Sequence, residues 1–480
     1  MLFPTFQFFV FFCVVFAVYW TLPYLTAIVP GLGEHRLHRL RMGWLLLASC
    51  YFYMSWNPIF ILLILFTASV DYIAARLMQQ TETVWKRRAL LIVSITLNLG
   101  LLAFFKYTNF LVGTAIGTLN LFGFENDPIV LQIILPLGIS FYTFETISYI
   151  VDVYQGKIKP VRNLLDYALY IMFFPHLVAG PIVRPHEFLP QIGQVKRWNW
   201  DRLQLGVQFF VLGLFKKAAI ADQLAGIVDP VFAQPTGYSS ASVWLAVVCY
   251  AAQIYCDFSG YSDMAVGLAH MLGFKLPRNF NLPYLADSIA DFWRRWHITL
   301  SSWLRDYLYI PLGGNRHGEW VTYRNLLMTM LLGGLWHGAN WTFVAWGLYH
   351  GLLLSLHRAI PWPRWTTSNL LRPFFTLGTF GLVSVGWVFF RAQTFSDAAV
   401  ILQKMLWPQG GQSFEPAVFA LASLALGGLL TGWVVSALVD LRRIERRIPA
   451  AVLGTGLAAA FVLAQILMPE DGKAFIYFQF

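Results

Sequence analysis

Long apolar runs separated by short polar segments repeat along all 480 residues of the chain. A helix needs about 20 apolar residues to cross the hydrocarbon core of a bilayer. Runs close to that length lie near residues 5–30, 43–56, 59–78, 89–124, 129–151, 164–182, 203–228, 240–256, 324–357, 370–391, 416–440 and 450–468. The pattern predicts an all-α polytopic membrane protein with about ten to twelve spans. Because such runs recur on both sides of every more polar stretch, we expect one membrane domain over residues 1–480.

Residues 255–323 are too polar to be ordinary spans and too aromatic to be an ordinary loop. Within them, apolar residues of the stretch 287–309 recur at three- and four-residue steps, which predicts an amphipathic interfacial or re-entrant helix. Its apolar stripe consists of Trp293, Trp296, Leu300, Trp303, Leu304 and Tyr307. Polar backbone at membrane depth is tolerated only where protein or a water-filled cavity surrounds it. We therefore expect a cavity with this helix in its wall.

Composition and charge agree with a membrane setting. The chain is 58% hydrophobic and 12% charged, whereas soluble proteins carry about 25% charged residues. The net charge of +10 does not indicate a nucleic-acid partner, because the basic residues fall in short loops between apolar runs. Cytoplasmic retention of Lys and Arg explains such loops, so residues 36–41 and 76–88 are predicted to be cytoplasmic and the turn at 57–58 external. The four cysteines lack metal-ligand spacing, and no metal site is expected.

The stretch 89–124 is too long for one straight span and too short for two. If it crosses the membrane once, the basic residues at 157–162 return to the cytoplasm.

Two histidines carry the candidate chemistry. His337 lies in an apolar run with small residues, LLGGLWHGAN at 331–340, and His297 closes the polar and aromatic run at 291–297. An ionisable group at membrane depth is costly, so its presence there indicates a functional site. Glycine pairs at 334/338 and 347/351 predict close helix packing around His337. If the helix continues past His337, Asn340 lies on the same face and is placed to orient the ring.

Two motifs resemble the signature of the membrane-bound O-acyltransferase family, and are most similar to its bacterial branch containing the alginate O-acetyltransferase membrane subunit. They are WRRWHITLSSWLRDYLYIPLGGNR at 293–316 and GLWHGAN at 334–340. Further similar stretches lie at 136–144, 174–181, 213–217, 255–263 and 475–480, so the resemblance covers nearly the whole chain. One position departs from it, because Glu145 stands where the branch is expected to carry Gln.

The resemblance implies a helical membrane enzyme pierced by a central funnel, with its catalytic region at about residues 255–351. His337 matches the family's characteristic histidine, and His297 matches its second histidine. Relatives of this kind move an acyl group from a thioester donor to a hydroxyl of an exported polymer. The implied co-substrate is acetyl-CoA or an acylated carrier, with no bound cofactor. The implied setting is a bacterial inner membrane, where periplasmic accessory proteins help transfer the acetyl group to polysaccharide.

The same chemistry follows from the residue types. A hydroxyl is a weak nucleophile, so acyl transfer needs a base, and a neutral imidazole serves well. We assign this role to His337, with His297 positioning substrate or stabilising charge, although the two roles are open to exchange. The tetrahedral oxyanion needs donors, for which His297, Asn340 and a backbone N–H near Gly338 are candidates.

Weaker candidates for substrate or donor binding surround these histidines. Guanidinium groups suit phosphate, so Arg294 and Arg295 are candidates for binding the phosphates of coenzyme A or of a phosphopantetheine carrier. The alternative is that these arginines pair with Asp257 and Asp263 inside the protein. Trp296 and Trp336, which adjoin the two histidines in sequence, are further candidates.

Other functions remain open from the sequence. A proton-coupled transporter also uses many spans and intramembrane histidines, and a non-catalytic scaffold or flippase of a polysaccharide export complex would tolerate loss of both histidines. Within the enzyme class, the alternative is transfer of D-alanine or another acyl group to a cell-wall polymer. The acceptor polymer, whether alginate, cellulose or another, is not fixed by these residues.

Overall fold

The computed structural model describes residues 1–27, 33–124, 127, 130–362, 368–438, 448–468 and 475–476. Within these residues the regular elements are helical, apart from one isolated bridge between Tyr238 and Gln412. The predicted all-α fold is therefore confirmed. The chain divides into two compact units, with Met1–Phe210 and Met264–Pro277 in unit 1 and Val211–Asp263 and Arg278–Phe480 in unit 2. The single domain over 1–480 stays a prediction.

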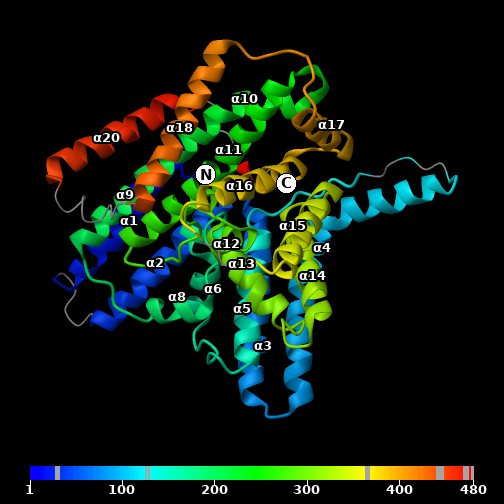
Figure 1. Ribbon diagram of the computed structural model, residues 1–480. Coiled ribbons are helices and arrows are strands. Elements are labelled where there is room, and N and C mark those ends of the chain that lie inside the picture. Colours follow the sequence, from blue (N-terminus) through cyan, green and yellow to red (C-terminus); the bar gives the residue numbers. More distant parts are fainter. Residues whose placement is uncertain are drawn as a thin grey trace. The chain divides into compact units, whose positions relative to one another are not determined.

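Unit 1 is built from helices of very different lengths (Figure 1). They are α1 (Phe6–Thr21), η1 (Leu22–Ala27), α2 (Glu34–Met54), η2 (Pro58–Phe60), α3 (Ile61–Gln80), α4 (Val84–Leu121), α5 (Ile139–Tyr154), α6 (Leu164–Met172), α7 (Phe174–Leu177) and α8 (Pro185–Ile192). The unit also holds the first part of α9 (Trp200–Phe215) and the last part of α11 (Ser240–Met271).

A buried polar network joins three helices of unit 1. The carboxylate of Asp71 on α3 accepts hydrogen bonds from Ser94 and Asn98 on α4, and Thr146 on α5 donates to the amide oxygen of Asn98 at 3.1 Å. These side chains are nearly inaccessible to solvent. Buried polar groups that lack partners destabilise a fold, so mutual hydrogen bonding fixes the positions of α3, α4 and α5.

The basic loops of unit 1 gather at one end. Arg39 near the start of α2 pairs with Asp166 near the start of α6 at 2.7 Å, and Arg87 at the start of α4 donates to the carbonyl of Tyr154 at the end of α5. The basic loops can gather in this way because the long apolar stretch 89–124 belongs to one continuous helix, α4, of 38 residues. The three basic loops thus share a side, as the charge pattern predicts for cytoplasmic segments.

Unit 2 contains the second part of α9, the first part of α11 and the helices that follow. Between α9 and α11 these are the π-helical segment η3 (Lys216–Ala221), α10 (Asp222–Ala233) and η4 (Pro235–Gly237). After α11 come η5 (Pro283–Leu285), α12 (Ile289–Arg295), α13 (Ile298–Leu304), the π-helical segment η6 (Arg305–Tyr309), α14 (Glu319–His337), α15 (Trp341–Ala359), α16 (Arg372–Arg391), α17 (Phe395–Leu406), α18 (Pro416–Leu438) and α20 (Ala450–Leu467).

Eight helices among the described residues are long and apolar enough to cross a membrane. They are Phe6–Tyr24, Pro58–Gln80, Val84–Leu121, Trp200–Ala233, Ser240–Met271, Arg372–Arg391, Pro416–Leu438 and Ala450–Leu467. The protein is a multi-pass membrane protein, as predicted. The other expected spans form shorter or more polar helices, namely α2, α5, α6 and the pair of α14 and α15.

The apolar stretch 324–357 is not one span but two helices packed side by side, α14 and α15 (Figure 1). Glycine makes this contact possible, as the sequence predicts. A Cβ on Gly334 would lie 2.3 Å from the carbonyl oxygen of Phe343, and one on Gly347 would lie 2.3 Å from that of Met330. The interpretation of Asn340 as a residue on the helical face of His337 is wrong, because α14 ends at His337 and Asn340 is the N-cap of α15.

The single amphipathic helix predicted over 287–309 is also wrong. The chain forms α12, breaks at Trp296 and His297, and resumes as α13 and η6. His297 lies in the left-handed region at φ 41°, a conformation that non-glycine residues rarely adopt. The backbone around the break is held by bonds to residues outside the stretch, since the N–H of Ile298 donates to the carbonyl of Asn279. Periodicity alone carries no information on such long-range contacts.

We predict that Gly347→Ala destabilises the protein by about 3 kcal/mol or more, because overpacking typically costs about 1–3 kcal/mol and the clash here is with backbone. The thermal midpoint of the detergent-purified protein measures this effect. Gly381→Ala on α16 is the matched control, since nothing lies within 4 Å of the added Cβ and Ala favours a helix interior by about 0.5–1 kcal/mol over Gly. Equal midpoints for the two variants would contradict the packing assigned to α14 and α15.

Candidate active site

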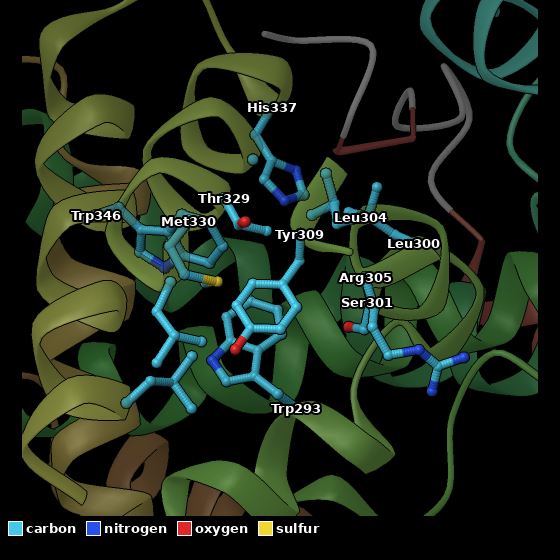
Figure 2. Close-up of a pocket in the computed structure, with 13 residues that line it drawn as sticks. Trp293, Leu300, Ser301, Leu304, Arg305, Tyr309, Thr329, Met330, His337 and Trp346 are labelled. Carbon is cyan, nitrogen blue, oxygen red and sulfur yellow. The ribbon is translucent and has the colours of Figure 1, made fainter. Parts of the chain in front are cut away.

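A cavity of about 250 Å³ lies within unit 2, bounded by α12, α13, η6, α14 and α15. Figure 2 shows the imidazole of His337 directed into it, with Trp346 and Met330 on one side and Leu300 and Leu304 on the other. Its lining is formed by Trp293, Leu300, Ser301, Leu304, Arg305, Tyr309, Leu326, Thr329, Met330, Gly333, His337, Trp346 and Leu354. The predicted cavity next to the 287–309 segment is therefore present, although the segment is not one helix.

His337 is the last residue of α14 and is held by aromatic rings. Its imidazole lies 5.0 Å from Trp346, 5.0 Å from Trp336 and 5.2 Å from Phe390, measured between ring centroids, with edge-to-face geometry in each case. Edge-to-face packing is the favoured arrangement of aromatic rings. The ring is thus fixed at the end of a helix and faces an almost apolar space.

His297 is completely buried, and its neighbours define its protonation state. The ring nitrogen Nδ1 lies 3.0 Å from the side-chain oxygen of Asn279, which also accepts hydrogen bonds from the N–H and the hydroxyl of Thr299. Because that oxygen is an acceptor, Nδ1 carries the proton and Nε2 is an unprotonated acceptor. Burial lowers the pKa of His297 to about 3, so the ring is neutral at physiological pH.

The two histidines do not share the cavity. His297 packs against Phe258 at 4.6 Å and Trp336 at 6.2 Å and does not line the cavity. Trp336 contacts both imidazoles, since its ring also lies 5.0 Å from that of His337. The indole of Trp336 therefore connects the two candidate residues and fixes one relative to the other.

The weaker candidates from the sequence do not line the cavity either. Arg295 pairs with Asp291 at 2.7 Å, Arg294 is exposed on α12, and Trp296 is buried in an aromatic cluster at 4.8 Å from Trp387. Asn340 is occupied at both ends, because its oxygen accepts from the N–H of Thr342 and its NH₂ donates to the carbonyl of Gln393. Asn340 therefore acts as the N-cap of α15, and it does not line the cavity, where an oxyanion donor is needed.

In the described part of the chain, Asp257 and Asp263 pair with lysines and not with arginines. Lys217 lies 2.6 Å from Asp257 and 2.8 Å from Asp222, while Lys216 lies 2.6 Å from Asp263. The second oxygen of Asp257 accepts the backbone N–H of Ile476 at 2.9 Å. This ion cluster therefore fixes the described part of the C-terminal stretch 475–480 against α11.

Sequence reasoning placed Trp293 in the apolar stripe of the expected cavity wall but gave its indole N–H no role, and it missed Trp346. Both indoles line the cavity, and in the described part of the chain neither buried N–H has a hydrogen-bond acceptor. It also missed His350, a fully buried residue of α15 whose ring lies 4.9 Å from Trp346 and 5.2 Å from Trp293. The signal for His350 was available, since it too is an ionisable residue in an apolar run.

A model of the MBOAT, membrane-bound O-acyltransferase family matches residues 159–390, which include every residue that lines the cavity. The chain is 43% identical to a probable alginate O-acetylase AlgI of Azotobacter vinelandii over 84% of this chain and 80% of that protein. The chain belongs to the membrane-bound O-acyltransferase family. It is thus an O-acyltransferase, as the resemblance of its motifs implied.

Two other relatives have different names. The acyltransferase is 41% identical to a peptidoglycan O-acetyltransferase of Helicobacter pylori, over 76% of this chain and 74% of that protein. It is 28% identical to a teichoic acid D-alanyltransferase of Bacillus subtilis, over 54% of this chain and 69% of that protein. The similarity thus extends to relatives that are named for different acceptors and different acyl groups.

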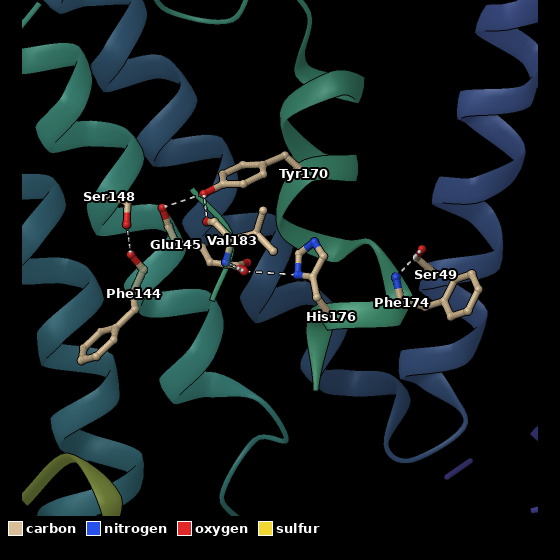
Figure 3. A network of polar contacts seen from close by, with 8 residues as sticks. All are labelled: Ser49, Phe144, Glu145, Ser148, Tyr170, Phe174, His176 and Val183. Atoms are coloured by element: carbon tan, nitrogen blue, oxygen red, sulfur yellow. Dashed lines mark hydrogen bonds and ion pairs between the residues drawn. The ribbon is translucent and has the colours of Figure 1, made fainter. Parts of the chain in front are cut away.

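Glu145, the departure from the branch pattern, lies in a buried polar network of unit 1 (Figure 3). Its oxygen Oε1 accepts the backbone N–H of Val183 at 3.0 Å and lies 3.2 Å from Nδ1 of His176, whose ring is poorly aligned for a hydrogen bond. Tyr170 donates to the carbonyl of Val183 at 2.9 Å. A Gln would keep the essential acceptor here, because its amide oxygen can also receive the Val183 N–H.

We predict that Glu145→Gln changes the free energy of unfolding by less than about 1 kcal/mol, whereas Glu145→Ala costs about 1–3 kcal/mol because the Val183 N–H loses its acceptor. Thermal midpoints of the two purified variants test this. If both variants lose the same stability, the contact with His176 and not the Val183 bond is the important one.

Proposed function

We propose that this acyltransferase moves an acetyl group from a thioester donor at the cytoplasmic side to a hydroxyl of an exported polysaccharide, with His337 as general base. The observation that supports it most is the imidazole of His337 in an apolar cavity beside two buried indole N–H groups that lack acceptors. Relatives named for O-acetylation of alginate and of peptidoglycan, at 43% and 41% identity, support the acetyl group and an envelope polymer as acceptor.

The reaction needs two proton transfers, one from the acceptor hydroxyl to His337 and one from His337 to the leaving thiolate. The acceptor hydroxyl attacks the thioester carbonyl carbon while the imidazole of His337 takes its proton, which typically accelerates such steps by about 10²–10⁴-fold. The tetrahedral intermediate then collapses, the carbon–sulfur bond breaks, and the thiolate leaves and takes up the proton. The products are the acetyl ester and the free thiol.

The oxyanion of the intermediate needs donors that are already in place. Among the polar side chains of the cavity, the hydroxyls of Ser301 and Thr329 are committed to backbone carbonyls. The guanidinium of Arg305 pairs with Asp306 and extends away from the imidazole in Figure 2. The phenol of Tyr309 and the indole N–H groups of Trp293 and Trp346 remain. We assign the role of oxyanion donors to the two indole N–H groups, because they are buried and already in place.

His297 has a different role in this scheme. A neutral ring whose Nδ1 donates to Asn279 presents an acceptor at Nε2, and so it suits a hydroxyl and not an oxyanion. Within the described residues this Nε2 has no partner. Because His297 is buried and does not line the cavity, its role in this scheme is to keep Trp336, and through it His337, in position.

The lining of the cavity favours acetyl over D-alanyl. A D-alanyl group carries an ammonium, and a buried ammonium needs a carboxylate or several hydrogen-bond acceptors. The residues that line the cavity include no Asp or Glu. An acetyl group carries no charge and matches the apolar walls. This favours acetyl transfer over the transfer suggested by the more distant D-alanyltransferase relative.

The remaining parts of the proposal concern donor, partners and location. The donor is acetyl-CoA or an acylated carrier. Arg294 can bind the phosphates of this donor, because it is exposed and has no ion pair among the described residues. Periplasmic accessory proteins receive the acetyl group or the polymer, and the enzyme lies in the bacterial inner membrane with its basic loops inside.

We predict that His337→Ala lowers polymer-bound acetate by about 100-fold, within the range expected for a lost general base. The measurement is ester-linked acetate on exported polymer, with protein level followed by immunoblot. His317→Ala is the control, because His317 is exposed and lies outside the cavity. Normal acetate in the His337 variant would favour the transporter or scaffold function.

We predict that Trp346→Phe lowers the turnover number by about 100-fold with little change in KM, as for loss of an oxyanion donor. Benzothienylalanine at this position keeps the ring shape without the N–H and should give the same loss. Trp387→Phe is the control, since the N–H of Trp387 already donates to Tyr284 and the residue does not line the cavity. Full turnover with benzothienylalanine would exclude the N–H as a donor.

A further inference from the structure

A second pocket lies wholly within unit 1, and the proposed acyl transfer does not use it. It has a volume of about 690 Å³ and is formed by residues 191–205 and 270–275. Its two walls are joined by reciprocal hydrogen bonds, because the side chain of Gln191 donates to the carbonyl of Lys275 and accepts its N–H. These two hydrogen bonds hold the walls of the pocket in fixed positions relative to each other.

The pocket is strongly basic. Lys196, Arg197, Arg202 and Lys275 line it, against one carboxylate, that of Asp201. Among the described residues the only ion pair of these four cations is a long one of 4.0 Å between Arg197 and Glu34 at the surface. Four positive charges thus converge with little internal compensation.

Lys196 is the most unusual of the four. It is 7% exposed, and its ammonium lies 4.5 Å above the ring of Phe274, with no described carboxylate in ion-pair distance. Behind it, the guanidinium of Arg41 donates to the carbonyl of Lys196 and is itself 2% exposed. Burial together with Arg202 and Arg41 lowers the pKa of Lys196 to about 8. Buried charges are normally paired, so an anion is the missing part of this arrangement.

Three candidate membrane spans have an end at this pocket, which places it at the membrane surface. Trp20, near the end of the first span, donates to the carbonyl of Met271, where the span Ser240–Met271 ends. The span Trp200–Ala233 begins beside the pocket at Trp200. The ring of Trp198 lies 5.1 Å from that of Trp20 and 5.0 Å from that of Trp200. Trp198 and Trp200 are exposed. Exposed tryptophans at span ends mark the headgroup level of a bilayer.

The pocket is on the side with the basic loops. The ring of His38, near the start of α2, is hydrogen-bonded to the carbonyl of Ile192 at 2.7 Å, and Arg41 reaches Lys196. The positive-inside rule places this end of unit 1 in the cytoplasm. The leaflet there carries the anionic lipids.

We propose that this pocket binds the phosphate of an anionic phospholipid headgroup from the cytoplasmic leaflet. A phosphate brings the anion that Lys196 lacks, and Arg202 and Lys275 are placed to share it. A soluble phosphorylated molecule such as coenzyme A offers the same chemistry, but the exposed tryptophans and the three span ends favour a lipid. Basic pockets between membrane helices on the cytoplasmic side commonly bind such headgroups.

The test uses the full-length purified protein in vesicles of phosphatidylcholine, with and without phosphatidylglycerol. We expect phosphatidylglycerol to raise the thermal midpoint. Each basic residue near an anionic surface contributes about fivefold in affinity, so Arg202→Gln together with Lys275→Gln should weaken lipid binding about 30-fold. Arg88→Gln is the matched control, an exposed cation at the same end of unit 1 but outside the pocket.

Lys196→Met separates the proposal from general surface charge. In phosphatidylcholine alone this variant should have a higher midpoint than the parent, because an uncompensated buried ammonium has been removed. Phosphatidylglycerol should then add little. Equal midpoints of the parent protein in the two lipids, or full lipid response in the pocket variants, would overturn the proposal.

Coenzyme A and inorganic phosphate, added to phosphatidylcholine vesicles, identify the source of the phosphate. If either raises the midpoint and phosphatidylglycerol does not, the lipid assignment is wrong. These measurements do not involve acetyl transfer, so their outcome is independent of the role proposed for His337.

Discussion

The need to pair polar groups away from water is the constraint on which this structure depends. Asp71 is surrounded by Ser94 and Asn98, and Asp257 is shared between Lys217 and the N–H of Ile476. Both arrangements join helices that apolar packing alone would leave free to slide. Some described buried polar atoms lack partners, and two of them, the indole nitrogens of Trp293 and Trp346, belong to residues that line the same cavity as His337. In the proposed mechanism, the substrate supplies the acceptors that these two indole groups lack.

The sequence predicted the architecture well where a single periodicity decides it. The apolar runs 59–78 and 450–468 form α3 and α20. The spacing of the basic loops predicted that they lie on one side, and in unit 1 these loops contact one another. It failed where a contact from elsewhere in the chain overrides the local pattern. The stretch 287–309 breaks at His297 because Asn279 bonds the neighbouring backbone and the imidazole, and no helical stripe can reveal such a partner.

The residues of the candidate site also fall into those that the sequence indicated and those that it did not. His337 was accessible to sequence reasoning because an ionisable residue in an apolar run is conspicuous, and His350 met the same criterion. The role proposed for Trp346 could not be predicted from the sequence, since most tryptophans in such a chain serve only in packing. Its unpaired N–H at the cavity is what distinguishes it. Asn340 shows the opposite error, because its spacing from His337 suggested a partner whereas the chain turns between them to begin α15.

Packing and chemistry are coupled at this turn. His337 is the last residue of α14, and the position of that end is set by the contact of Gly334 and Gly347 with the facing backbone. Trp346, one residue before Gly347, is carried to the imidazole by the same contact. A displacement of about 1 Å between α14 and α15 would therefore move the proposed base, His337, relative to the proposed oxyanion donor, Trp346, and displacements of that size typically reduce catalysis about 10²-fold. In the proposed mechanism, the same glycines therefore determine the geometry of the reaction as well as the stability of the helix pair.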